Sequence, residues 1–490
     1  MRDLGPAVAV AASLLFAASA ARAGATLELT GAPTSTNGMS ARVLGRGAAV
    51  AYFNPALLPD TPPTTEAGYF LVITHTSIAL APRPGGVDVP ESIYDAQLGG
   101  PGGSSQRLAL RPLPTAELVN PRRNTLVRDT TGYAALGVVR PIFGDRLVFG
   151  FYTLLPLHSF LEQHGYFSDE RAQYFTNQLH YELLGDRKTM TTFAVAFGSR
   201  LADWLSVGGG ADISIGTRTD MAVYVPDAGD QSQVLLGPNI RTATTAAPYF
   251  SVLTQPDPHL QVTMLMHMAT SIGTDGQNQL RFWNYTYPKG QNSIKQIYEF
   301  SQGYEPLRVA IGGVYSARPH GLGKNWQVGA QAVLTRWSQY RDRHNEKPLD
   351  TWRDTISPTL GGAVDMGSQR ISADLGYVPS PVPDQTGRTN YVDSSKIVAS
   401  LAFDTPTSVL GASFGMGFYL SGQLLLKRSV TKSADAVHPV IDELPDNATD
   451  FVKNQPLPGA KGLQTNNPGY PGWSAQGWML GGGVAFRLPR

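Results

Sequence analysis

Apolar side chains recur at every second position in the strongly hydrophobic segments of the chain, so the period is two and not the 3.6 of a helix. Segments 147–151 and 478–488 show this alternation, and Phe193, Val195 and Phe197 lie on one face of a third segment. Each segment is short and bounded by Gly, Pro, Asp or Asn, as β-strands are. The pattern predicts an all-β protein.

The alternate face of these strands carries Gly, Ala and Ser with occasional polar side chains, such as Asp212, Gln327, Gln331 and Asp374. A soluble sandwich would have fewer glycines within its strands. A barrel with a lipid-facing apolar band and a polar lumen explains both faces. Because lipid offers no water to an open sheet edge, such strands must close on themselves. We therefore predict an antiparallel transmembrane β-barrel.

Connections between the predicted strands alternate between short turns and long loops. Segments 142–146 and 200–204 are expected to be tight periplasmic turns. Segments 157–188 and 216–260 are expected to be extracellular excursions, and the Pro- and Gly-rich stretch 82–121 a further loop. This asymmetry is typical of outer-membrane barrels.

Four tryptophans lie near predicted strand ends: Trp204, Trp326, Trp337 and Trp478. Tryptophan is enriched where a membrane meets water, so they suit an interfacial aromatic belt. Ordinary packing is the alternative for each of them, because Trp is highly buried on average.

The N-terminus predicts export. Residues 7–20 form an almost uninterrupted apolar run, and Ala21-Arg22-Ala23 offers a small-x-small cleavage site before Gly24. This is the layout of a signal peptide over residues 1–23. A membrane anchor is the alternative, but the run is shorter than the roughly 20 residues that span a bilayer. With a barrel to follow, the expected location is the bacterial outer membrane.

Charge and cysteine content exclude several classes of function. The chain has 39 basic and 38 acidic residues, so nothing draws it generally toward nucleic acid. It has no cysteine, which excludes disulfides, thiol catalysis and thiolate metal sites. The stability of a large exported protein without disulfides must come from elsewhere, and a continuous hydrogen-bonded sheet can supply it.

Two common catalytic motifs are absent: the sequence has no His-Glu-x-x-His and no phosphate-binding loop of the Walker type. One predicted loop, 158–182, gathers His158, His164, His180, Glu162, Asp169 and Glu182. Their spacing matches no ligand pattern, so we interpret them as solvated loop residues. Ser159 beside His158 is no hydrolase pair, because adjacent strand residues point to opposite faces. We expect no enzyme, no cofactor and no metal.

Three motifs resemble the FadL-like family of outer-membrane transporters for long-chain fatty acids and other hydrophobic compounds. Residues 45–56 are similar to the family's small-residue segment that ends in Asn-Pro-Ala. Residues 335–340 resemble its strand-end Trp-Ser motif and are followed by 352–354. Residues 376–384 resemble its strand that closes in Ser-Pro-Val-Pro, with 393–396 at the expected distance. The three motifs occur in family order.

The resemblance implies a barrel of about 14 strands over residues 61–490 with long extracellular loops. It also implies that residues 24–60 fold into the lumen as a hatch. This segment is rich in small residues and lacks strand alternation. Phe53, Asn54, Pro55 and Ala56 are the expected gate, since Asn54 before proline is held extended. The alternative is that Asn54-Pro55-Ala56 is only the turn into the first strand.

The implied function is passive uptake of fatty acids or other hydrophobic compounds, captured on apolar loops and released laterally or into the periplasm. The candidate capture residues, on the long loops, are Tyr174, Phe175, Tyr249, Phe250 and Leu253. The alternating Met264, Met266 and Met268 are better explained by strand packing. The expected partners are the hydrophobic small molecule and outer-membrane lipid, and the protein is expected to be a monomer.

The last strand indicates a further partner. The spacing Gly483-x-x-Phe486-x-Leu488 resembles the C-terminal signal read by the barrel-assembly machinery, although Pro489-Arg490 follow it where most such signals end in an aromatic residue.

Two other functions stay open. A general diffusion porin for polar solutes would have an open lumen and no hatch. A barrel hydrolase or adhesin would carry its activity on the outer loops. The sequence does not name the hydrophobic substrate, because apolar pockets discriminate weakly between similar molecules.

Overall fold

A computed structural model describes most of the chain. The described residues are 25–34, 38–80, 124–143, 146–157, 179–180, 191–225, 235–282, 293–318, 325–341, 347–348, 350–384, 390–409, 412–431 and 472–489. The predicted signal peptide at 1–23, the loop at 82–121 and most of the segment 157–188 lie outside them, as do Tyr174 and Phe175.

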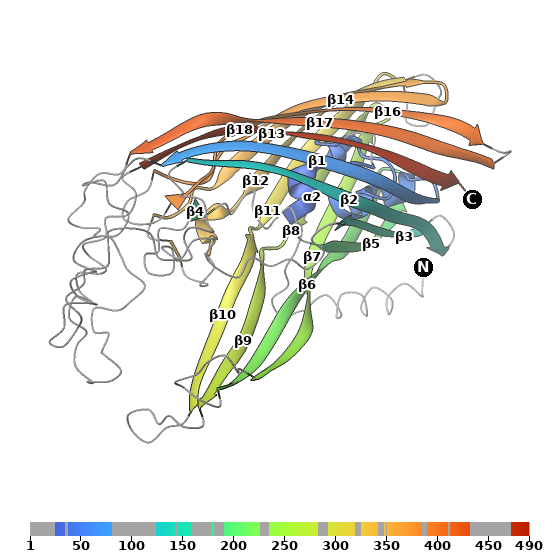
Figure 1. Ribbon diagram of the computed structural model, residues 1–490. Coiled ribbons are helices and arrows are strands. Elements are labelled where there is room, and N and C mark those ends of the chain that lie inside the picture. The colour runs from blue at the N-terminus through green and yellow to red at the C-terminus, as the bar shows by residue number, and fades with distance from the viewer. Residues whose placement is uncertain are drawn as a thin grey trace, which may run out of the picture.

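The described strands form a closed antiparallel barrel of 14 strands (Figure 1), which confirms the predicted fold class. Its members in chain order are β1 (Thr64–Leu80), β2 (Asn124–Phe143), β3 (Leu147–Pro156), β5 (Thr192–Ala202), β6 (Leu205–Val225), β7 (Leu235–Asp257), β8 (Leu260–His267), β11 (Arg308–Ser316), β12 (Asn325–Thr335), β13 (Thr355–Met366), β14 (Gln369–Val378), β16 (Lys396–Val409), β17 (Ala412–Thr431) and β18 (Gly472–Pro489). The first and last strands pair along their whole length, from Thr64↔Pro489 to Leu80↔Trp473, and so close the ring.

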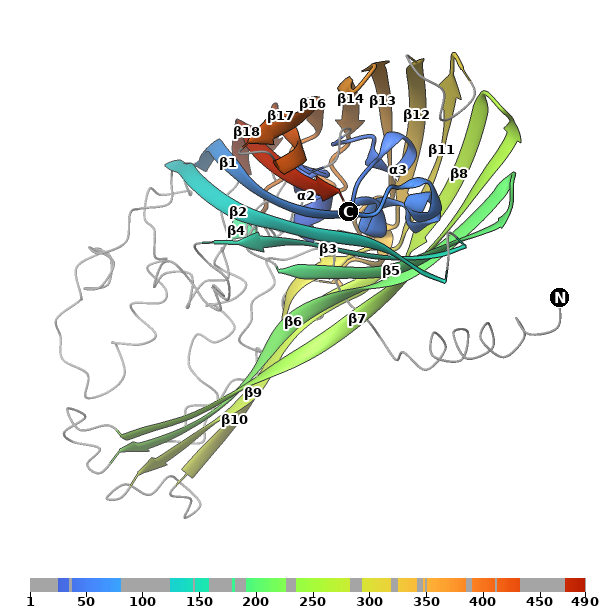
Figure 2. The ribbon, with the colours of Figure 1, turned by 90° about the vertical axis from the view of Figure 1, so that its right-hand side faces the viewer.

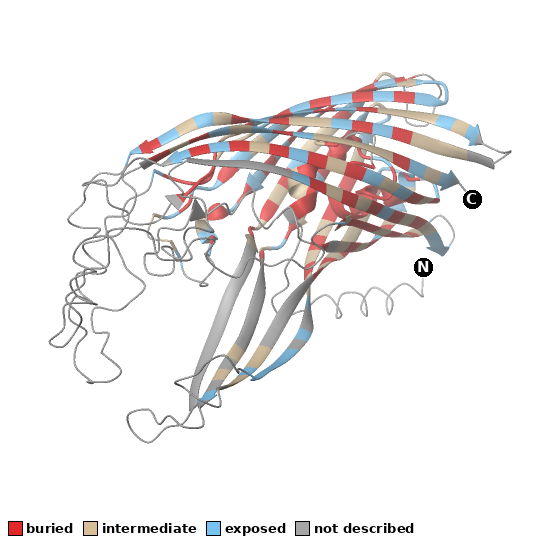
Figure 3. Ribbon diagram, in the orientation of Figure 1, coloured by how far each residue is buried: buried red, intermediate tan, exposed pale blue. Residues whose placement is uncertain are grey.

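Burial alternates along the barrel strands, most regularly on β8, β12 and β14 (Figure 3), as the period of two predicts. On β11, Ile311 and Tyr315 point outward and are more than half exposed, whereas Ala310 and Val314 are buried. The last strand repeats this, with Leu480 and Leu488 exposed. An outer surface with large exposed apolar side chains is the surface that a membrane barrel presents to lipid. The predicted polar lumen face is also correct, since Asp212, Gln327, Gln331 and Asp374 are all buried.

The two ends of the barrel differ. At one end the connections are tight: β5 ends at Ala202 and β6 begins at Leu205, and β13 turns into β14 through Gly367. Gly367 has φ +72°, the left-handed conformation that hairpin turns of this kind need. At the other end the chain runs from Leu80 to Asn124 between β1 and β2. We call these the short-turn end and the long-loop end.

Strands β6 and β7 continue far past the barrel, where β9 (Thr270–Phe282) and β10 (Ser293–Glu305) join them. The long strands pair without interruption from Leu205↔Thr254 to Tyr224↔Leu235, and β9 runs parallel to the outer part of β6 (Figures 1 and 2). The expectation that 216–260 is a loop excursion is therefore wrong. Backbone pairing holds residues 216–225 and 235–257 extended, although the side chains of this part of the sequence do not alternate between apolar and polar.

Smaller elements complete the described chain. The N-terminal elements are α2 (Ala25–Thr30), α3 (Ala41–Leu44), α4 (Val50–Phe53) and the 3-10 helix η1 (Pro55–Asp60). At the long-loop end, β4 (Leu179–His180) pairs with β15 (Asn390–Tyr391), and η5 (Trp337–Gln339) follows β12. Within the described ranges, no helix is long and apolar enough to cross a membrane. Figure 2 shows the N-terminal elements inside the ring of strands.

Candidate functional site

The N-terminal segment, defined as Ala25–Asp60, packs against the inward face of the barrel wall. Its buried side chains form one apolar cluster with inward residues of the wall, among them Phe70, Tyr133, Tyr152 and Tyr419. Glycines of the wall admit the segment at its closest approaches. A Cβ on Gly208 would stand 2.3 Å from the carbonyl carbon of Pro55. The wall therefore makes room for this segment by having glycine, which has no side chain, at the closest contacts.

Polar side chains of the wall also hold the backbone of the N-terminal segment. The Asp374 carboxylate accepts from the amides of Met39 and Ser40 at 3.1 and 3.2 Å and from the Ser40 hydroxyl at 3.1 Å. Gln331 Nε2 donates to the Met39 carbonyl at 2.9 Å, and Gln423 Nε2 donates to the Leu29 carbonyl at 2.6 Å. These bonds satisfy backbone groups that a short, irregular segment leaves unpaired.

The predicted gate residues lie deep in the lumen. Asn54 is fully buried, and its Nδ2 donates to the Arg42 carbonyl at 2.7 Å and to Thr263 Oγ1 on β8 at 2.8 Å. The amide of Ala56 donates to Ser251 Oγ on β7 at 2.8 Å. Pro55 and Ala56 begin the 3-10 helix η1, which runs to Asp60, and β1 begins only at Thr64, so Asn54-Pro55-Ala56 is not the turn into the first strand. Phe53 is buried beside them, and a gating role stays a prediction.

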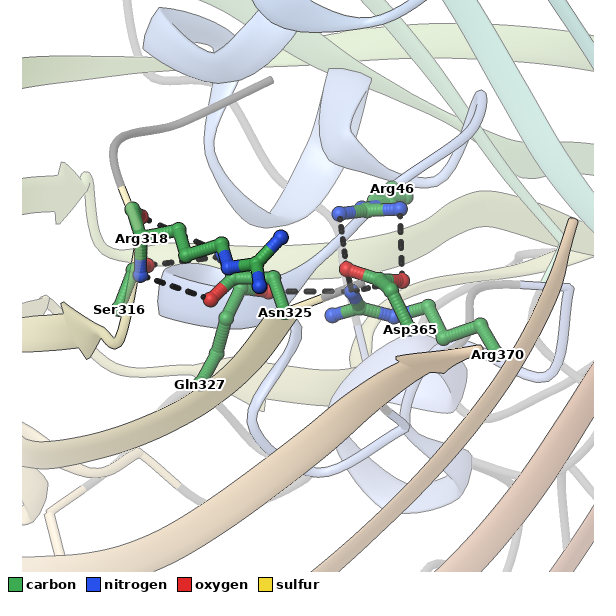
Figure 4. A network of polar contacts seen from close by, with 7 residues as sticks. All are labelled: Arg46, Ser316, Arg318, Asn325, Gln327, Asp365 and Arg370. Carbon is green, nitrogen blue, oxygen red and sulfur yellow. Dashed lines mark hydrogen bonds and ion pairs between the residues drawn. The ribbon is translucent and has the colours of Figure 1, made fainter. Parts of the chain in front are cut away.

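An ion-pair network joins the segment to the wall near the short-turn end (Figure 4). Arg46 reaches Asp365 on β13 at 3.3 Å, and Arg370 on β14 binds the same carboxylate at 3.0 Å. Arg370 also donates to Gln327 Oε1 at 3.0 Å. Arg46 is half exposed, so its own ion pair contributes little. The buried Arg370 holds Asp365 in place to receive it.

A denser charge cluster lies on the side of the segment toward the long loops. Glu28 accepts from Arg42 at 2.5 Å and from the Tyr52 hydroxyl at 2.8 Å, and Arg308 Nε lies 3.9 Å away. Burial alone would raise the pKa of Glu28, but Arg42 and Arg308 outweigh burial and hold that pKa well below its ordinary range. The Glu28 carboxylate therefore stays charged and links α2, α3 and α4 to the wall.

Tyr249 belongs to the interior and not to a loop. It lies on β7, stacks on His267 with the ring centroids 4.6 Å apart, and donates from its hydroxyl to the Ala51 carbonyl at 2.7 Å. Leu253 is buried on the same face of β7, and Phe250 points to the other face. The expected loop position of these three capture candidates is therefore wrong, because β7 runs through all of them.

A cavity of about 140 Å³ remains between the N-terminal segment and the wall, on its long-loop side. Apolar groups that line it include Leu29, Val333, Trp337, Val378 and Val398. Polar groups that line it include Glu28, Arg42, Arg308, Gln331, Lys396 and Gln423. Its walls therefore offer apolar surface and hydrogen-bonding groups together, as small-molecule sites do.

Two of the three motifs that resemble the FadL-like family, at 335–354 and 376–384, meet beside this cavity. Trp337, Tyr340, Trp352, Val382 and Tyr391 form one buried cluster, in which Tyr340 and Trp352 stack with centroids 3.7 Å apart. The place predicted for Trp337 in an interfacial belt is therefore wrong, since the motifs pack around it. Trp204 and Trp326, by contrast, are about half exposed.

Arg428 fixes the proline-rich segment 380–384 against the wall. From the bulge in β17 its guanidinium donates to the carbonyls of Val382 and Pro383, at 2.8 and 3.0 Å, and to Ser380 Oγ at 3.0 Å. It also lies over the ring of Trp473, 5.7 Å from the centroid. Because Pro381 lines the cavity, Arg428 sets the position of one cavity wall.

Sequence reasoning missed several of these residues. Asp374 and Gln331 were recognised as lumen-facing, but not as anchors of the N-terminal segment. Gly208 lies in the run Gly208-Gly209-Gly210, a visible signal, yet only the fold shows that its missing side chain makes room for Pro55. Arg428 had no sequence signal. No group of three His, Cys, Asp or Glu side chains suited to a metal occurs in the ranges described above, in which His158 and His164 are not included.

No family model and no curated protein matches the sequence. Solved structures do. A FadL homologue from Pseudomonas aeruginosa aligns over 96% of this chain and 98% of its own, with 13% identity and a TM-score of 0.52. The toluene transporter TodX from P. putida aligns over 96% and 99%, with 10% identity and a lower TM-score of 0.45. At such identities the likeness concerns the fold, and at that level it confirms the predicted resemblance: the chain has the fold of the FadL-like outer-membrane transporters.

Proposed function

We propose that the protein takes up long-chain fatty acids or other hydrophobic compounds passively across a bacterial outer membrane. In this proposal residues 24–60 act as a hatch, and cargo leaves laterally into the membrane or toward the periplasm. Phe53, Asn54, Pro55 and Ala56 move with the hatch. Tyr249 and Leu253 would contact cargo inside the lumen and not on a loop.

One observation carries the proposal: a barrel with an apolar outer face holds a folded segment in its lumen and keeps a part-apolar cavity above it. A segment held by separate hydrogen bonds, such as those of Asp374, Gln331 and Gln423, can be displaced one contact at a time.

Release is the harder step for a hydrophobic molecule. Each buried methylene stabilises the bound state by about 0.8 kcal/mol, so a long acyl chain binds without strong polar contacts. The site must therefore change shape to let it go. A shift of the N-terminal segment alters the cavity directly, because Glu28, Leu29, Met39 and Arg42 form part of its lining.

The wall near β3 supports a lateral exit. Strand β2 pairs with β1 from Asn124 to Val139, but its ladder with β3 ends at Tyr133↔Pro156. The β2–β3 ladder also contains a register shift between Pro141 and Phe143. A short, irregular ladder has fewer hydrogen bonds to break than the full-length one between β1 and β18. A lateral exit at this ladder would break fewer strand-to-strand hydrogen bonds than one between β1 and β18.

The diffusion porin is the weaker alternative, since it requires an open lumen and the N-terminal segment packs across this one. The hydrolase or adhesin would act through outer loops that lie mostly outside the described residues. Nothing in the described lumen favours either of them.

A reversible cross-link tests the hatch. A Cβ on Gly361 would lie 2.9 Å from the Ser40 Cβ, so a shift of the segment by roughly 1 Å would bring the pair to the separation of about 3.8 Å that a disulfide spans. The chain has no cysteine of its own, so S40C/G361C forms a single defined pair. In a deletion strain, uptake of labelled oleate is expected to stop when this variant is oxidised and to return on reduction. The single variants S40C and G361C are the controls.

Oleate uptake by the oxidised double variant at the level of the single variants would refute a moving hatch. Normal oleate uptake in the deletion strain, combined with sugar-permeable conductance of liposomes that contain the protein, would refute hydrophobic uptake altogether and favour the porin.

A further inference from the structure

Two exposed arginines stand at the long-loop end of the wall, just beyond two strands that pair with each other. Arg336 follows Thr335, the last residue of β12, and Arg353 lies two positions before Thr355, the first residue of β13. Thr335 and Thr355 are partners in the β12–β13 ladder. The ladder therefore brings the two arginines to one place on the rim of the barrel.

A contact between two tryptophans keeps the arginines together. Trp337 and Trp352 are buried, and their ring centroids lie 5.5 Å apart. Arg336 precedes the first of these tryptophans and Arg353 follows the second. The arginines are exposed whereas the tryptophans are buried, so the pair of cations flanks one fixed contact on its exposed side.

The backbone of both arginines is also held by neighbouring segments. The amide of Arg336 donates to the Leu307 carbonyl at 2.9 Å, and the amide of Arg353 donates to the Pro381 carbonyl at 2.8 Å. Their positions are therefore set by the wall and not by a free loop.

The side chains of these arginines lack a counter-charge. Among the residues that the structure describes, no carboxylate forms an ion pair with Arg336 or Arg353. The acidic neighbour Asp354 accepts from the Ser338 amide at 2.8 Å through its Oδ1. Two cations at one place repel each other, and an anion bound between them would turn this repulsion into two charge-assisted contacts.

The arginines also stand at the height where the lipid-facing surface ends. The outward side chains of β12 and β13 are apolar along the pair and 38 to 60% exposed at its two ends, Leu334↔Ile356 and Trp326↔Val364. Arg336 comes ten positions after Trp326, which is a rise of about 26 Å for about 3.4 Å per residue and a tilt of about 40°. The apolar band of outer-membrane barrels is about 25 Å tall, so the arginines lie at the level of the lipid head groups.

We propose that Arg336 and Arg353 bind a phosphate of a phosphorylated glycolipid in the outer leaflet, whose acyl chains lie along the outer face of β12 and β13. A guanidinium donates two parallel hydrogen bonds to a phosphate. The apolar column below favours a lipid over free phosphate, because acyl chains bury apolar surface that an ion cannot. Since Trp337 lines the cavity, the lipid would steady one cavity wall from outside. The inference rests on the outer-membrane location in the proposed function, but it concerns a surface outside the lumen.

Two lipids that differ only in their phosphates test the site: lipid A and the same lipid A after enzymatic dephosphorylation. The full chain, purified in detergent, is titrated with each lipid, and bound lipid is counted by native mass spectrometry. We expect lipid A to bind at least roughly tenfold more tightly than its dephosphorylated form, because two charge-assisted contacts are lost with the phosphate. Inorganic phosphate at the same concentrations is expected not to displace lipid A.

Variants assign the binding to its residues. R336Q and R353Q should each lower the affinity for lipid A several-fold and leave that for the dephosphorylated lipid unchanged. The double variant R336K/R353K keeps both charges but loses the planar fork, so an intermediate affinity is expected. K427Q is the matched control, since Lys427 is an exposed cation near the long-loop end of β17. We expect K427Q to bind lipid A as the wild-type protein does.

Equal binding of the two lipids by the wild-type protein would overturn the inference. So would a loss in K427Q as large as that in R336Q, which would reduce the effect to general charge. Displacement of lipid A by inorganic phosphate would assign the arginines to a free anion and refute the lipid. None of these results alters oleate uptake or its response to the hatch cross-link, so a failure here is distinct from a failure of the proposed function.

Discussion

Gly208 offers the most direct test of how the N-terminal segment is held in the barrel. In G208A the new Cβ would stand 2.3 Å from the carbonyl carbon of Pro55 and 2.4 Å from the amide nitrogen of Ala56. Ordinary contacts begin at 3.4 Å, so the segment must retreat by roughly 1 Å. These neighbours are backbone atoms, which cannot rotate away as a side chain can.

The retreat has a cost that can be worked out. It lengthens the bond of 2.8 Å between the Ala56 amide and Ser251 Oγ beyond hydrogen-bonding range, a loss of about 1 kcal/mol. Overpacking adds about 1 to 3 kcal/mol. We therefore expect docking of the segment to weaken by roughly 2 to 4 kcal/mol, while the strands keep their ladder.

Planar-bilayer conductance measures the result, because a displaced segment opens the lumen to ions. The matched control is G209A, the next residue on the same strand, whose Cβ points to the other face and meets nothing nearer than Phe250 Cδ1 at 3.3 Å. We expect frequent channel openings for G208A and few for G209A. Equal conductance of the two variants would refute the idea that missing side chains on the wall seat the segment.

The remaining predictions concern Glu28 and Asp374, which hold the N-terminal segment, and Arg428, which holds residues 380–384. E28Q leaves Arg42 without its buried partner, so docking should weaken by roughly 3 kcal/mol, measured as the urea concentration at which conductance begins. Because the pKa of Glu28 is lowered, the charged Glu28 stabilises docking of the segment at every pH above the ordinary value of 4.5, and this stabilisation is lost only well below that value. The conductance of the wild-type protein should therefore stay constant from pH 8 to pH 5. A rise in conductance within that range would contradict this account. D374A leaves three donors of Met39 and Ser40 unpaired and should cost more, by the same urea assay, than D374N, which keeps one carboxamide oxygen for them; the reverse order would count against Asp374 as an anchor. R428K cannot fork between the carbonyls of Val382 and Pro383, so oleate uptake should fall several-fold with an unchanged barrel melting temperature, and unaltered uptake would separate Arg428 from the cavity.

The barrel was predictable because its signal is local. Alternation at Phe193, Val195 and Phe197 reports that one face of a strand meets an apolar medium, and that follows from backbone geometry alone. The polar lumen followed from the same period, through residues such as Gln327 and Asp374. Where alternation failed, between 216 and 260, the prediction failed too, because pairing of β6 with β7 depends on a partner strand and not on a pattern within either one.

The interior site was much less visible. In the sequence, Tyr249 was interpreted as an aromatic residue on a long loop. In the structure it stacks on His267, and its hydroxyl donates to the carbonyl of Ala51, 198 positions earlier in the chain. Trp337 and Trp352 were recognised only as separate motifs, and their contact is made by chain segments that meet at the long-loop end. Such contacts join residues far apart in sequence, so no local pattern encodes them.

The sequence by itself determined that the chain forms strands with one apolar face, since every second side chain carries that information along its own strand. It also indicated a small-residue N-terminal segment of a different kind. Only the tertiary structure decided that this segment packs against Gly208, that Asp374 and Gln331 hold it, and that a cavity remains beside it. The physical reason is that the packing of the segment and the shape of the cavity both depend on how the segment fits the inner face of the wall. That inner face forms only when the barrel closes.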